Sequence, residues 1–242
     1  MRRTALLAGL AVLAAFLFAA AARRRAADPN ELIRRFEGGD HSCYADSRWL
    51  THEELAQYSV GDPARGSFMR CDLDGDGVDE LLWNDLTLLP GMPDTTRIKG
   101  IFTCKNGAVS CIFLDLNDSS EFLFLGQSGR LVYTAPNYGT YLYENYDCVT
   151  FTPNGQYCPL YRLEIYNIYS MEEVNPNWGE IHPNMTQPGI YCKKVTRTSA
   201  YGEVFAGEEA ALTLDEFKDE YQALTGFAYE SSAMMLPIEP LP

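Results

Sequence analysis

Between residues 66 and 205 the chain consists of short β-rich segments separated by turn-forming residues, and this pattern constrains the fold more than any other feature. The segments are rich in Val, Ile, Phe, Tyr and Thr and span residues 101–103, 109–114, 122–125, 131–133, 141–143, 149–151, 161–168 and 190–195. Asn-Gly pairs at 106–107 and 154–155 are typical of tight hairpin turns. Because this region lacks the helical crossovers that parallel strands need, we expect an antiparallel sheet, with a long surface loop at residues 171–187.

Three helix-start signatures lie outside this region, each with a capping side chain followed three residues later by an acid. They are Asp28-Pro29-Asn30-Glu31, Thr51-His52-Glu53-Glu54 and Thr213-Leu214-Asp215-Glu216. A capping side chain of this kind accepts a hydrogen bond from a backbone N–H of the first helical turn. The sequence therefore predicts an α+β fold. We expect a predominantly antiparallel β meander of hairpins with short helices at its N- and C-terminal ends, forming a single β-rich domain over residues 23–242.

One acidic segment, Asp72-Leu73-Asp74-Gly75-Asp76-Gly77-Val78-Asp79-Glu80, places carboxylates at alternate positions ahead of an apolar stretch. Calcium takes about six to eight oxygen ligands, and a tightly curled loop with acids at its first, third and fifth positions can bring them to one point. Gly77, the sixth residue, permits the left-handed turn that such a loop requires. The predicted ligands are the side chains of Asp72, Asp74, Asp76 and Glu80 and the backbone carbonyl of Val78.

An acidic surface turn is the alternative explanation for this loop, because Asp-Gly pairs are common turn formers. Acids this close together would repel one another without a cation, which favours the metal site. The twelfth loop position is Trp83, where a helix–loop–helix EF-hand has a bidentate Glu. Since residues 81–83 have the character of a buried strand, we expect the loop to lead into a sheet instead of joining two helices.

The stretch FMRCDLDGDGVDELLW at residues 68–83 resembles the D-x-D-G-D-G-x-x-E-L loop of exported bacterial proteins with FG-GAP or VCBS-type calcium loops. It is more closely similar to exported single-loop proteins of Gram-positive bacteria. In those proteins an N-terminal helical segment leads into the loop, β-hairpins follow, and a short helix comes last. The resemblance implies that residues 212–224 form that last helix, and it implies calcium ligands at Asp72, Asp74, Asp76, Val78 and Glu80.

The N-terminus has the layout of an export signal. Two arginines precede an uncharged apolar run at residues 4–22, and Ala20 and Ala22 provide an A-x-A cleavage site. The run is also about long enough to cross a bilayer, so residues 1–22 are either a cleaved signal peptide or an uncleaved membrane anchor. In either case we expect the rest of the chain to be secreted or held at the outer face of the cell membrane.

The 242-residue chain has 33 acidic against 19 basic residues, a formal net charge of −14. A surface of this charge repels phosphate backbones, which excludes nucleic acid as a partner. Cations and neutral ligands are favoured instead. Calcium is thus the predicted cofactor, and an extracellular glycan or protein is a further candidate partner. Membrane contact is expected only through an uncleaved N-terminal segment.

Seven cysteines fit an exported protein, and the absence of a C-x-x-C pair gives no support to a zinc or thioredoxin-type site. Cys104 and Cys111 flank one Asn-Gly turn, and Cys148 and Cys158 flank the other. Both spacings could bring two thiols together across a hairpin, which predicts the disulfides Cys104–Cys111 and Cys148–Cys158. The alternative is that these cysteines are reduced and half-buried.

The sequence carries no evident catalytic motif. It has three histidines and contains neither G-x-S-x-G nor H-E-x-x-H. We therefore expect a non-enzymatic exported protein in which one structural Ca²⁺ stabilises a β-rich fold.

The alternative function is an extracellular carbohydrate- or protein-binding module that presents a tyrosine-rich sheet face. Eight tyrosines alternate with polar residues, at Tyr138, Tyr141, Tyr143, Tyr146, Tyr157, Tyr161, Tyr166 and Tyr169. Exposed tyrosines combine apolar area with a hydrogen-bonding tip and could stack on sugar rings or contact a protein. The competing interpretation is cross-strand packing of half-buried tyrosines within the sheet.

Overall fold

The computed structural model describes residues 28–89, 95–116, 121–135, 137–138, 142–152, 156–168, 180, 182–197 and 207–229. Its helical elements are α2 (Pro29–Glu37), the short 3-10 helix η1 (His41–Cys43), α3 (His52–Gln57) and α5 (Leu214–Thr225). Its strands are β1 (Ser67–Cys71), β2 (Glu80–Leu88), β3 (Thr96–Lys105), β4 (Ala108–Leu114), β5 (Phe122–Leu125), β6 (Leu131–Thr134), β7 (Asn137–Tyr138), β8 (Leu142–Phe151), β9 (Tyr157–Ile168), β10 (Gly189–Arg197) and β11 (Gly207–Leu212). The predicted leader, residues 1–22, lies outside the described residues. Within them, no helix combines the length and apolarity needed to cross a membrane.

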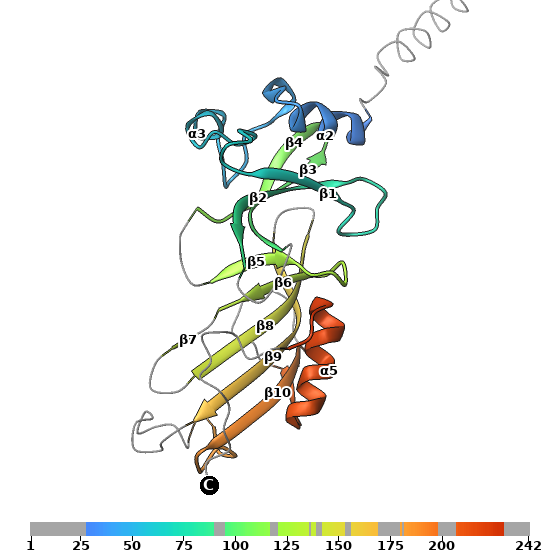
Figure 1. Ribbon diagram of the computed structural model, residues 1–242. Helices are drawn as coiled ribbons and strands as arrows, with labels where there is room; N and C mark the ends of the chain where they lie inside the picture. The colour runs from blue at the N-terminus through green and yellow to red at the C-terminus, as the bar shows by residue number, and fades with distance from the viewer. Residues whose placement is uncertain are drawn as a thin grey trace, which may run out of the picture.

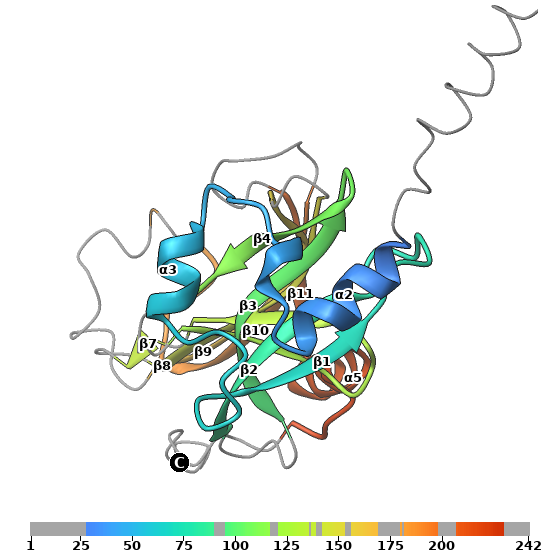
Figure 2. The ribbon, with the colours of Figure 1, turned by 90° about the horizontal axis from the view of Figure 1, so that it is seen from above.

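All eleven strands belong to one sheet in which every strand pair is antiparallel, so the predicted α+β class is confirmed. The strand order is β1-β2-β3-β5-β6-β8-β9-β10-β11, with β4 beside β3 and β7 beside β8. Figure 1 shows α2 and α3 at the end of the sheet formed by β1–β4, and α5 against β8–β10 at the other end. Viewed from above in Figure 2, both N-terminal helices lie over the same end of the sheet.

The helices begin at the predicted residues because the local side chains satisfy the first backbone N–H groups. The Asp28 side chain accepts a hydrogen bond from the N–H of Asn30 at the start of α2. Before α3 and α5, Thr51 and Thr213 each form a complete capping box with the Glu three residues later. α5 then ends at a left-handed glycine, with φ 81° at Gly226.

The Asn-Gly turn at 106–107 joins β3 to β4. Both of its residues have positive φ, 54° at Asn106 and 79° at Gly107, which is the backbone of a two-residue hairpin turn. The second predicted turn, at 154–155, lies outside the described residues. So does most of the loop expected at residues 171–187.

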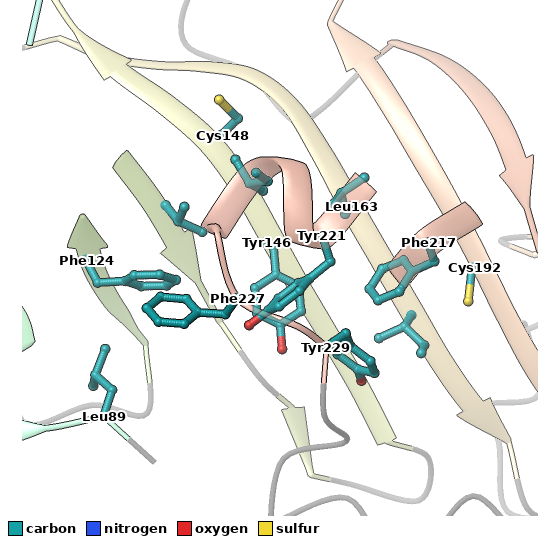
Figure 3. Close-up of a cluster of buried hydrophobic side chains, with 13 residues drawn as sticks. Leu89, Phe124, Tyr146, Cys148, Leu163, Cys192, Phe217, Tyr221, Phe227 and Tyr229 are labelled. Carbon is teal, nitrogen blue, oxygen red and sulfur yellow. The ribbon is translucent and has the colours of Figure 1, made fainter. Parts of the chain in front are cut away.

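The three larger hydrophobic clusters of the described residues hold the sheet and helices together. The N-terminal cluster packs α2 and α3 on β2–β4 and includes Ile33, Phe36, Leu55, Leu81, Phe102 and Val109. The central cluster runs along the sheet from β2 to β8 and includes Leu82, Ile98, Ile101, Leu123, Leu131 and Phe151. The C-terminal cluster packs α5 on β8–β10, and Figure 3 shows the rings of Tyr146, Tyr221 and Tyr229 gathered at its centre.

The two ends of the sheet meet where β3 runs beside β5. In the described part of the chain these strands pair at one position, Ile98 opposite Leu123, because β4 occupies most of that edge of β3. Both residues belong to the central cluster and are essentially inaccessible to solvent. Apolar packing across the junction therefore supplements a very short backbone ladder.

The cysteines do not pair as expected, since all seven are free thiols. The sheet register explains the difference for the β3–β4 hairpin, where Val109 and not Cys111 lies opposite Cys104. Diagonal neighbours on an antiparallel pair are about 7–8 Å apart, which is beyond the reach of a disulfide. In the β8–β9 hairpin Cys158 lies opposite Thr150 instead of Cys148. Neither predicted bridge, Cys104–Cys111 or Cys148–Cys158, is formed.

The loop after β5 approaches α5 so closely that Gly126 has no room for a side chain. A Cβ at this position would lie 2.7 Å from the carbonyl oxygen of Thr225, whereas a Cβ at Gly38 would lie 3.4 Å from its nearest neighbour. We therefore expect Gly126→Ala to lower the free energy of unfolding by about 1–3 kcal/mol, because the buried end of α5 must move. Gly38→Ala should change it by no more than about 0.5 kcal/mol. Urea unfolding of both variants measures the difference, and equal midpoints would contradict this packing.

Candidate metal centre

The acidic loop is the connection between β1 and β2, which pair as far as Cys71 opposite Glu80. Residues 72–79 therefore leave and re-enter the sheet at neighbouring points. Gly75 and Gly77 have φ of 76° and 85°, and no other atoms lie near the place where a Cβ would stand. These glycines are needed for their left-handed backbone, as predicted for Gly77, and not for lack of space.

The acids of the loop hold its backbone in a tight curl. The carboxylate of Asp72 accepts hydrogen bonds from the N–H groups of Gly75, at 2.8 Å, and Gly77, at 3.0 Å. Asp74 and Asp76 each accept one from the N–H two residues later, at 3.2 Å and 2.7 Å. This pattern explains why short acids alternate along the segment, because Asp readily forms such local turns.

Three of the predicted ligands come together in space. Carboxylate oxygens of Asp72, Asp74 and Glu80 all lie within 4.8 Å of one another. Oxygens bound to one Ca²⁺ each lie about 2.3–2.6 Å from it, so pairs of ligand oxygens are separated by up to about 5 Å. The group therefore has the spacing of a calcium site. Asp76 is not part of it, and Asp76 and the Val78 carbonyl remain predicted ligands.

Glu80 differs from the other two acids because it is buried, with 4% of its surface exposed. Its Oε2 accepts a hydrogen bond from the Leu73 N–H at 3.0 Å, and its Oε1 accepts one from the Thr103 hydroxyl at 2.8 Å. Burial raises the pKa of Glu80, these two hydrogen bonds lower it, and the charges of Asp74 and Asp76 raise it again. The net pKa is above the ordinary value because burial outweighs the two hydrogen bonds, and a nearby positive charge would lower it.

A cation could supply that charge. Among the described residues, no Lys or Arg forms a salt bridge with an acid of the loop. Each carboxylate oxygen has two lone pairs, so a hydrogen bond from the protein leaves a position for a metal. The group contains no His or Cys, and an all-oxygen set suits a hard cation such as calcium and not zinc.

Asn30, in the first turn of α2, holds the loop in place, and no pattern in the sequence indicated this role. Its Nδ2 donates to the carbonyl of Gly77 at 3.0 Å, and its Oδ1 accepts from the N–H of Asp79 at 2.8 Å. The two bonds lie on either side of Val78, whose carbonyl is a predicted ligand. Asn30 therefore fixes the orientation of that peptide. Figures 1 and 2 both show the loop beside the start of α2.

The loop also lies next to residues of the central cluster. A small cavity beside the carboxylates is lined by Leu73, Asp74, Glu80, Thr103, Ile112, Phe151 and Thr152. Phe151 belongs to the end of β8, and Leu73 packs against the same central cluster. The group of carboxylates therefore lies against the central cluster, and not on an isolated surface turn.

The described tyrosines do not form one exposed face. Tyr146 and Tyr161 pack with the C-terminal cluster under α5. Tyr143 and Tyr166 lie in another cluster, with ring centroids 4.7 Å apart and their hydroxyls on Glu164. All four are buried or half-buried, which agrees with cross-strand packing. The side chains of the other four, Tyr138, Tyr141, Tyr157 and Tyr169, lie outside the described part.

Comparison of the chain with protein-family models, with curated proteins and with solved structures gave no match. The similarity of residues 68–83 to FG-GAP or VCBS-type loops therefore remains a prediction from the sequence.

Replacing Asn30 with Ala should weaken the attachment of α2 to the loop. The variant loses both hydrogen bonds, and we expect the free energy of unfolding to fall by about 1–2 kcal/mol. The Asp79 amide should exchange faster with solvent deuterium, because it loses its acceptor. Glu31→Ala, in the same helical turn, removes a surface ion pair with Arg34 and should leave Asp79 exchange unchanged. Unaltered exchange in Asn30→Ala would show that this contact does not hold the loop.

Proposed function

We propose that residues 72–80 bind one Ca²⁺ through Asp72, Asp74 and Glu80, together with Asp76 and the carbonyl of Val78. The observation that best supports this is the grouping of three carboxylates within 4.8 Å, one of them buried. Asp72 and Asp74 are exposed, so an ion could enter from solvent. Calcium is favoured over magnesium because a loop of carboxylates and a carbonyl is adaptable, whereas Mg²⁺ needs a smaller octahedral shell.

The ion would be structural. The residues around its site come from the β1–β2 loop, from β3 through Thr103 and from α2 through Asn30. Binding would offset the repulsion among the acids and the cost of burying Glu80, and would favour the folded chain because the unfolded chain has no assembled site. We propose, on this basis and on the leader-like N-terminus, a non-enzymatic exported protein whose fold calcium stabilises.

Calcium should raise the melting temperature of the protein. Extracellular calcium modules have dissociation constants of about 10⁻⁴–10⁻³ M. At about ten times that concentration, binding to the folded state adds about 1.4 kcal/mol, which for a chain of this size raises the melting temperature by about 3–6 °C. Thermal melts in CaCl₂, MgCl₂ and EDTA, with calorimetric titration, measure the effect. Identical melts in calcium and EDTA, with no heat of binding, would refute the proposal.

The variant Asp74→Asn should have opposite effects with and without calcium. Without metal it relieves repulsion around Glu80 while its amide oxygen can still accept from Asp76, so the melting temperature in EDTA should rise slightly. In calcium it loses a ligand charge, and most of the calcium-induced increase should disappear. Asp79→Asn removes the same charge from the same loop outside the carboxylate group, and should keep most of that increase. Equal calcium responses in the two variants would contradict the assignment of Asp74.

A further inference from the structure

A second candidate site lies at the opposite end of the sheet from the acidic loop. It is a pocket of about 370 Å³ lined by His182, Pro183, Asn184, Met185, Ile190, Tyr191, Cys192, Lys193, Glu209, Ala211 and Leu212. β10 and the edge strand β11 form one side, and the turn at residues 182–185 forms the other. That turn is closed by a hydrogen bond from the Met185 N–H to the His182 carbonyl at 3.0 Å, with a proline at its corner. The pocket has the size of a small-molecule site.

Lys193 forms the polar end of the pocket and is held there by two carboxylates. The ammonium of Lys193 lies 3.1 Å from Glu164 and 2.9 Å from Glu209. Glu164 is buried, with 6% of its surface exposed, and also accepts hydrogen bonds from the hydroxyls of Tyr143 and Tyr166. Because these contacts restrain Lys193, a ligand that accepts a hydrogen bond from its third N–H would bind at little further cost in side-chain entropy.

The rest of the pocket is apolar and aromatic. Met185 contributes aliphatic surface from the turn, and the Tyr191 ring is fixed by a hydrogen bond from its hydroxyl to the Gln187 carbonyl at 2.7 Å. Burial lowers the pKa of His182, and the nearby charge of Lys193 lowers it further. The imidazole is therefore neutral at pH 7.

The charges around Lys193 determine which class of ligand the pocket favours. Lys193 is paired with Glu164 and Glu209, and Arg162 bridges Glu164 to Asp147, so this network has three acids against two bases. Its excess of negative charge disfavours anions, as does that of the chain as a whole. A cation would have to approach the ammonium of Lys193. A neutral hydroxylated ring suits both the ammonium and the carboxylates. Its oxygens can accept a hydrogen bond from Lys193 and its hydroxyls can donate to Glu209, while its C–H face covers the apolar wall of the pocket.

We propose that this pocket binds a neutral sugar ring. The proposal is independent of calcium. It also differs from a tyrosine-rich sheet face, because it depends on one pocket at the β10–β11 edge and on the Lys193–Glu209 pair.

The experiment compares two alanines of the edge strand. Ala211 lines the pocket opposite Lys193 in the register, and Ala210, its neighbour, points to the other face of the sheet opposite Lys194. Ala211→Phe fills the pocket without removing a charge, and Ala210→Phe is the matched control. The probes are the methyl glycosides of glucose, galactose, mannose and N-acetylglucosamine, observed by saturation-transfer NMR.

We expect saturation transfer to at least one glycoside with the wild type and with Ala210→Phe, and affinity lower by about tenfold or more with Ala211→Phe. Glu209→Gln, at a largely exposed side chain, should also weaken binding without disturbing the fold, so the test does not depend on Ala211→Phe folding normally. No transfer to any glycoside with the wild type would overturn the proposal. Full binding by a folded Ala211→Phe, or tighter binding of glycine or acetate than of the glycosides, would also overturn it.

Discussion

The burial of the Glu80 carboxylate is the constraint around which the N-terminal end of the molecule is arranged. A charged group at the first residue of β2 can be buried only if donors reach it, and the Leu73 N–H and the Thr103 hydroxyl do so from the loop and from β3. The loop must therefore curl back over the strand that it precedes. That curl brings Asp72 and Asp74 to the same carboxylate and leaves the far side of the loop for Asn30 to hold.

Much of the fold was predictable because it depends on interactions between residues close in sequence. The capping boxes at Thr51 and Thr213 involve residues three apart, and the turn at Asn106 depends on its own backbone conformation and that of Gly107. The strand order was not predictable in this way. The sharing of one edge of β3 between β4 and β5 follows from packing among distant segments, and no local pattern encodes it.

The same distinction applies to the candidate site. Acids at alternate positions of one loop predicted Asp72, Asp74 and Glu80. Asn30 and Thr103 contact the loop from 47 and 23 residues away, and no local spacing pattern indicates them. The disulfide prediction failed for a related reason. Spacing across a turn suggested that Cys104 and Cys111 are close, but the register makes them diagonal neighbours. Proximity in a hairpin is decided by register, which the turn determines residue by residue.

The short β3–β5 ladder has a consequence for how the protein unfolds. Each end of the sheet has its own hydrophobic cluster and its own helical cover, while the described residues form a backbone ladder of one residue pair between the ends. The cooperativity of unfolding therefore depends on the side chains of the central cluster. When those side chains are well packed, the two ends melt as one thermodynamic unit. When they are not, calorimetric and van 't Hoff enthalpies diverge, and each end can open by itself.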